Sequence, residues 1–116
     1  MSDITIYHNP GCGTSRNTLA LLRDKGIEPT VVEYLKAGWD PPQLKALLAG
    51  MNASPRDVLR VRGTPAEELG LTNPAVSDQA ILQAMIAHPI LVERPIVVSP
   101  KGVRLARPAE KVAELL

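Results

Sequence analysis

The residue with the clearest chemical potential is Cys12, the single cysteine of a 116-residue chain. A short apolar and β-branched run at residues 4–7 leads into turn-forming residues at 8–11, and a helical pattern begins at Thr14 or Ser15. Cys12 is therefore expected where a strand passes into a helix. The unpaired N–H groups and the positive dipole at a helix start stabilise a thiolate and lower its pKa. Its position makes Cys12 a candidate nucleophile.

The residues around Cys12 indicate an anion site in the same loop. Gly11 and Gly13 flank the thiol, and glycines before a helix let the backbone approach a tetrahedral oxyanion closely. His8 is either an ordinary loop residue or an imidazole that orients or charge-balances the thiolate, and both alternatives stay open. A buried, inert thiol is the competing interpretation of Cys12. The two glycines and the helix start favour the reactive one.

The cysteine count limits the redox chemistry. One cysteine forms neither an internal disulfide nor a cysteine-based zinc site. Ser15 stands where a Cys-x-x-Cys pair has its second thiol. A thiol from outside the chain must therefore resolve any adduct formed on Cys12.

The elements that position this loop follow from local patterns. Residues 4–7 and 30–34 read as parallel strands joined by a helix that Gly26 ends, which is a βαβ unit. A hairpin is predicted from two short strands, residues 96–98 and 103–106, which flank a turn at 99–102. A final helix is expected to open at Pro108, with Val112, Leu115 and Leu116 on one face. The expected fold is α/β with a mixed sheet.

Between these parts, residues of about 40–88 predict a helical insert. Capping residues stand directly before prolines at three helix starts, namely Asp40–Pro41, Ser54–Pro55 and Thr64–Pro65. A longer helix is expected from Ser77 to near His88, because Pro89 stops it there. The element order is then βαβ, helical insert, ββα, within a single domain over residues 1–116.

Composition excludes several classes of partner. A net charge of +1 provides no field for a polyanion, so we expect no nucleic-acid binding. The chain has no basic leader followed by a long apolar stretch, and no apolar run approaches the roughly 20 residues of a membrane helix. We therefore expect no membrane association, a cytoplasmic location and, by default, a monomer.

Residues 7–19 resemble the active-site loop of the glutaredoxin-coupled arsenate reductases. The likeness continues in residues 88–91, 94–98 and 107–108, so it spans most of the chain. It implies a thioredoxin-like fold and an enzyme that converts arsenate to arsenite. Throughout thioredoxin-like folds the proline beside the active cysteine follows a cis bond, so the resemblance also implies a cis Arg94–Pro95 bond.

The resemblance implies that three arginines hold the arsenate oxygens, at the positions of Arg60, Arg94 and Arg107. Guanidinium groups suit this task because they bind tetrahedral oxyanions through two N–H groups and stay charged. Arg94 and Arg107 each stand before a proline at the edge of an expected strand or helix, whereas Arg60 rests mainly on the resemblance.

The implied reaction is attack of Cys12 on arsenate with loss of water, followed by attack of glutathione, a co-substrate, on the adduct. Glutaredoxin then completes the reduction and arsenite leaves. The resemblance thus implies no protein metal site and no bound cofactor.

Two alternatives stay open. One is a thioredoxin-fold redox regulator that binds RNA polymerase, although such regulators typically keep Cys-x-x-Cys. The other is a related thiol reductase with another substrate.

Overall fold

The computed structural model describes residues 3–116, and these form two compact units. The first unit combines the residues up to Ala37 with Arg94–Leu116, and the second is Gly38–Glu93. The second unit contains the whole segment, about 40–88, that was expected as a helical insert. The assignment of one domain to residues 1–116 stays a prediction.

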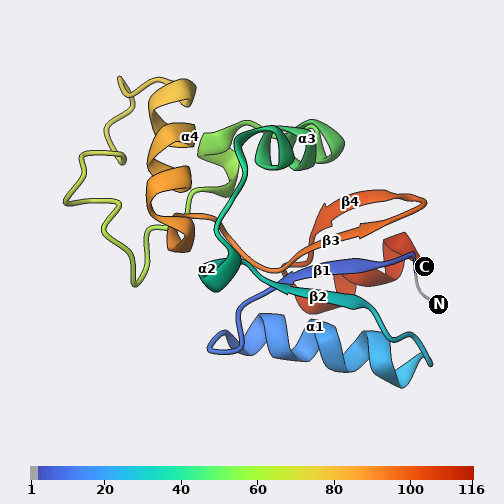
Figure 1. Cartoon of the computed structure of the whole chain (residues 1–116). Coiled ribbons are helices and arrows are strands. Elements are labelled where there is room, and N and C mark those ends of the chain that lie inside the picture. Colours follow the sequence, from blue (N-terminus) through green and yellow to red (C-terminus); the bar gives the residue numbers. More distant parts are fainter. Residues whose placement is uncertain (1–2) are drawn as a thin grey trace. The chain divides into compact units, whose positions relative to one another are not determined.

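The first unit is a four-stranded mixed sheet with helices (Figure 1). Its elements are β1 (Thr5–His8), α1 (Gly13–Asp24), β2 (Thr30–Glu33), α2 (Tyr34–Ala37), β3 (Ile96–Ser99), β4 (Gly102–Leu105) and the 3-10 helix η3 (Ala109–Leu115). The strand order is β2-β1-β3-β4, with β1 parallel to β2 and antiparallel to β3, and with β3 antiparallel to β4. The expected βαβ unit and hairpin are therefore confirmed.

A buried apolar layer joins α1, η3 and one face of this sheet. Ile6 of β1 and Val97 of β3 are paired in register and belong to it, together with the fully buried Leu22 of α1. Because the chain has no phenylalanine, burial of aliphatic side chains such as these is the main source of its folding stability. The layer fixes α1 along the sheet and so fixes the start of α1 beside the end of β1.

Two sequence predictions at element ends need correction. The second strand ends at Glu33, and Tyr34 begins α2 instead of closing the strand. The last helix is a 3-10 helix, in which every third residue lies on one face. Ala109 therefore joins Val112 and Leu115 in the buried set, while Leu116 is only half-buried.

The second unit contains α3 (Pro41–Met51), η1 (Pro55–Val58), α4 (Asp78–Ala87) and η2 (Pro89–Leu91). Asp40 and Ser54 are the N-cap residues of α3 and η1, as expected, and Ser54 Oγ accepts a hydrogen bond from the Asp57 N–H at 3.3 Å. Ser77, expected as the first residue of the longer helix, is instead the N-cap of α4, and its Oγ accepts from the Ala80 N–H at 3.1 Å. The helix expected to end near His88 ends at Ala87. These caps satisfy backbone donors that a helix start leaves open.

The helix expected from Thr64–Pro65 is absent, and turns occupy this stretch. Gly70 adopts a φ of +73°, which ends any helix after about one turn from Pro65. The Arg56 guanidinium also donates to the carbonyls of Leu71 and Val76, at 3.3 and 2.7 Å. The side chain that holds these carbonyls thus comes from another element, η1. A capping pattern reports only on neighbouring residues, so the pattern at Thr64 could not predict this contact.

The Arg94–Pro95 peptide bond is cis, as predicted, and the Arg107–Pro108 bond is also cis, which was not predicted. Within residues 3–116, no helix is long and apolar enough to cross a membrane.

We predict that Leu22→Ala lowers the free energy of unfolding by about 2–5 kcal/mol, because it opens a cavity in the layer beneath the sheet. Urea unfolding followed by circular dichroism measures this change. Leu35→Ala is the matched control: Leu35 is 41% exposed in the same unit, so its truncation is expected to cost less than about 0.5 kcal/mol. Equal losses in the two variants would contradict this description of the core.

Candidate functional site

Cys12 lies at the junction of β1 and α1, as the sequence predicts, and is the N-cap residue of α1. Its N–H donates to the Asn9 carbonyl at 3.0 Å, and its own carbonyl accepts from the Arg16 N–H at 3.0 Å. These bonds hold the thiol at the first turn, and α1, described in full, has no acidic residue in that turn. The helix dipole therefore acts on the thiol without a competing carboxylate.

Two arginines from the β3–β4 side of the sheet converge on this thiol. Arg107 Nη1 lies 3.8 Å from Cys12 Sγ and donates to the Arg94 carbonyl at 2.9 Å. The Ala106 N–H donates to the Pro95 carbonyl at 2.9 Å. Backbone and side chain thus hold the segments before β3 and after β4 beside Cys12.

Arg94 is the most unusual of the side chains beside Cys12. It is 8% exposed, and its Nε and Nη1 atoms are buried without a hydrogen-bond partner among the residues that the structure describes. Buried charged donors are costly unless they are satisfied. The arrangement therefore has the capacity to bind an anion.

The pKa of Cys12 is lowered. Burial acts to raise this pKa, but hydrogen bonding from the Ser15 backbone and from the Arg94 and Arg107 guanidinium groups outweighs it. All of these groups stabilise the negatively charged sulfur. The site is built to hold a thiolate.

Ser15 connects the other polar residues of the loop. Its hydroxyl lies 2.6 Å from His8 Nδ1 and accepts from the Asn9 N–H at 3.1 Å. Burial, the largest influence, lowers the pKa of His8, so the imidazole is neutral at pH 7. This geometry favours His8 as a residue that positions the loop through Ser15, rather than one that balances the charge of the thiolate.

The two glycines are exposed and flank Cys12 as expected. The Gly11 N–H already donates to Asn9 Oδ1 at 2.9 Å, and a Cβ at Gly11 would lie 3.3 Å from the same oxygen. Gly13 has more room, because a Cβ at this position would lie 3.8 Å from Arg16 Nη2. Contact of Gly11 and Gly13 with an oxyanion stays a prediction.

Arg60, the third expected arginine, belongs to the second unit. Its Nη1 pairs with Glu93 Oε1 at 2.8 Å, and its Nε donates to the Arg62 carbonyl at 3.1 Å. The backbone N–H of Arg60 donates to the Leu91 carbonyl at 2.7 Å, which fixes the backbone at this position. The role of Arg60 in holding arsenate stays a prediction.

Sequence reasoning missed the contribution of Ser15, which it treated only as the place of an absent cysteine. A usable signal exists in the helical spacing. Ser15, Thr18 and Leu22 are the buried residues of α1 and lie three and then four positions apart. This periodicity places the Ser15 hydroxyl on the inner face of α1, next to the strand end.

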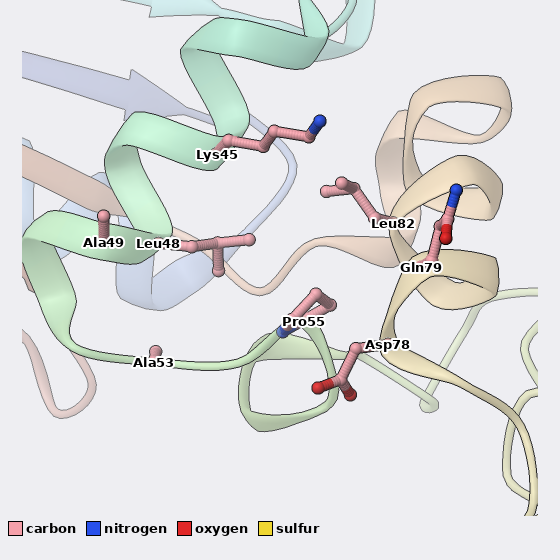
Figure 2. A pocket seen from close by; sticks show the side chains of 8 residues that line it. All are labelled: Lys45, Leu48, Ala49, Ala53, Pro55, Asp78, Gln79 and Leu82. Carbon is pink, nitrogen blue, oxygen red and sulfur yellow. The ribbon is translucent and has the colours of Figure 1, made fainter.

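A hollow in the second unit is another candidate for a site. It has a volume of about 500 Å³ and opens between α3 and α4, where Leu48 and Leu82 face each other (Figure 2). Its lining contains no cysteine or histidine; the lining residues are Lys45, Leu48, Ala49, Ala53, Pro55, Asp78, Gln79 and Leu82. Residues 3–116 also bring no three metal-ligating side chains together. Cys12, with Arg94 and Arg107 beside it, therefore stays the candidate for nucleophilic chemistry.

We predict that alkylation of Cys12 by iodoacetamide shows a pH midpoint below the free-thiol value of about 8.5. Arg107→Gln removes the positive charge 3.8 Å from the sulfur, so it should raise this midpoint. Arg104→Gln is the control, because exposed Arg104 pairs with Glu114 instead. An unshifted midpoint in the unmodified chain, or equal midpoints in the two variants, would contradict the assigned electrostatics.

We also predict that Arg60 and Glu93 are energetically coupled. A double-mutant cycle with Arg60→Gln and Glu93→Gln should give a coupling of about 1 kcal/mol in urea unfolding, because these side chains are only 16% and 24% exposed. The Arg23–Glu28 pair is 52% and 73% exposed and should give less than about 0.5 kcal/mol. A larger coupling in the exposed pair would rule out this ranking.

The chain is similar to members of one known protein family. Residues 7–115 match the ArsC family. The chain is 55% identical over 113 residues to an arsenate reductase of Rhizobium meliloti (strain 1021), covering 97% of this chain and 81% of the relative.

An arsenate reductase of Escherichia coli (strain K12) is 51% identical over 116 residues, which is 100% of this chain and 82% of the relative. The solved structure of an arsenate reductase from Vibrio cholerae superposes with a TM-score of 0.91 at 42% identity and covers 97% of each chain. The chain therefore belongs to the ArsC family and has its thioredoxin-like α/β fold.

Proposed function

We propose that this protein reduces arsenate to arsenite with Cys12 as nucleophile, glutathione as co-substrate and glutaredoxin as partner. The observation that carries the proposal is the meeting of one thiol of lowered pKa with two guanidinium groups, one of which has buried donors without a partner among the described residues. The arsenate reductase names of relatives at 51–55% identity support arsenate as the oxyanion.

In the binding step, Arg94 and Arg107 receive the arsenate oxygens. The Nε and Nη1 atoms of Arg94 offer charged N–H groups that bind an oxyanion bidentately. Arg107 carries its charge beside the sulfur. Their charges offset the repulsion between a thiolate and an anionic substrate, which would otherwise oppose close approach.

In the covalent step, the Cys12 sulfur forms a bond to arsenic, and one arsenate oxygen leaves as water after taking up protons. Glutathione then attacks the Cys12 sulfur of the adduct, the S–As bond breaks, and its electron pair stays on arsenic, which leaves as arsenite. The two electrons that convert As(V) to As(III) thus come from the two thiols, which end as a mixed disulfide between Cys12 and glutathione. Glutaredoxin then reduces this disulfide with electrons from further glutathione, which regenerates the Cys12 thiol. An external thiol is required because Cys12 is the only cysteine of the chain.

We predict that catalytic amounts of the protein produce arsenite over many turnovers only when glutathione and glutaredoxin are both present. The measurement is arsenite formation coupled to nicotinamide consumption by glutathione reductase. A thioredoxin system without glutathione should not support turnover, because the chain has no second thiol to present a disulfide.

Two controls make this assay decisive. Cys12→Ser should abolish arsenite formation, and Ser99→Cys, which adds a thiol outside the Cys12 loop, should not remove the need for glutathione. Turnover with thioredoxin alone, or an unchanged rate in Cys12→Ser, would overturn the mechanism. Failure to form arsenite with every thiol system would overturn the assignment of arsenate as substrate.

A further inference from the structure

Tyr34 is a site residue to which neither the sequence patterns nor the resemblance pointed. It is the first residue of α2 and is only 1% exposed. In the parallel pairing of β1 with β2, His8 stands opposite Glu33, so the residues that directly follow the two strands are Asn9 and Tyr34. The carboxyl ends of parallel strands lie at the same edge of a sheet. Tyr34 follows β2 and the Cys12 loop follows β1, so both lie at that edge.

The phenol of Tyr34 is electrostatically connected to the reactive group. Its burial raises its pKa, against the opposing effect of Arg94, and the Cys12 sulfur adds to the rise. The Asn9 and Arg94 side chains also act on this phenol as hydrogen-bonding groups. Tyr34 is thus an un-ionised O–H donor throughout the neutral range, close to Arg94.

We propose that Tyr34 is an oxyanion-binding residue, and that its hydroxyl donates a hydrogen bond to an oxygen of the arsenate held by Arg94. This inference rests on the proposed function. A neutral donor complements the arginines because it binds an oxygen without adding charge beside the thiolate. The Nε and Nη1 atoms of Arg94, buried and without a partner among the described residues, are further donors near Tyr34 that an oxyanion would satisfy.

The test is the Tyr34→Phe variant, which removes the hydroxyl and keeps the ring. Protection of Cys12 from iodoacetamide by arsenate, measured without any other thiol, reports binding independently of turnover. The half-protecting arsenate concentration should rise at least about tenfold, as expected for loss of a hydrogen bond to a charged group. The KM for arsenate in the coupled assay should rise by a similar factor.

Tyr7→Phe is the matched control, because it makes the same chemical change at the other tyrosine, on β1, and should leave protection unchanged. Tyr34→His keeps a ring N–H donor and should bind arsenate more tightly than Tyr34→Phe. Circular dichroism and the rate of Cys12 alkylation without arsenate report whether each variant is folded.

The outcomes separate this inference from the proposed function. Unchanged protection and KM in Tyr34→Phe, with arsenite formed normally, would overturn the role of Tyr34 alone. A lowered melting temperature with unchanged protection would also overturn it, since Tyr34 would then serve only packing. Weakened protection in Tyr34→Phe without arsenite formation by the unmodified chain would support Tyr34 and overturn the reaction. No protection of the unmodified chain by arsenate would overturn both.

Discussion

One guanidinium group contacts both the scaffold and the Cys12 thiol, and the rest of the site depends on it. Arg107 Nη1 donates to the Arg94 carbonyl and approaches Cys12 Sγ within 3.8 Å. A shift of the segment after β4 relative to the segment before β3 would therefore move positive charge away from the thiol. The hairpin that closes the sheet controls the electrostatics of a residue near the other end of the chain, so the stability of the fold and the reactivity of the thiol share one contact.

Burial and charge act in opposite directions at this site. A buried thiol is ordinarily held in its protonated form, whereas here the Ser15 backbone and two arginines reverse the effect of burial on the Cys12 pKa. The same burial leaves two donors of Arg94 without a partner among the described residues. Under the proposed function, bound arsenate accepts hydrogen bonds from these donors. Because the donors are already oriented before arsenate binds, the site needs little reorganisation during the reaction.

The polar network beneath the loop keeps these charges in place without adding another. His8 is neutral at pH 7, and its Nδ1 atom lies 2.6 Å from the Ser15 hydroxyl. Ser15 also accepts the Asn9 N–H, which ties the end of β1 to the first turn of α1. A hydroxyl at this position supports the loop but supplies no second thiol. Ser15 thus accounts both for the hydrogen bonds that join His8 and Asn9 to α1 and for the proposed need for glutathione.

The sequence by itself determined the features that depend on nearby residues: the βαβ unit, the hairpin, the caps at Asp40 and Ser54, and the place of Cys12 before a helix. Periodicity, turn formers and capping residues act within a few positions, so they can be read along the chain. Only the tertiary structure decided that the stretch after Thr64 forms turns, and that Tyr34 lies at the site. It also decided which arginine reaches the thiol, because Arg107 is 95 positions from Cys12 and meets it through strand order and register.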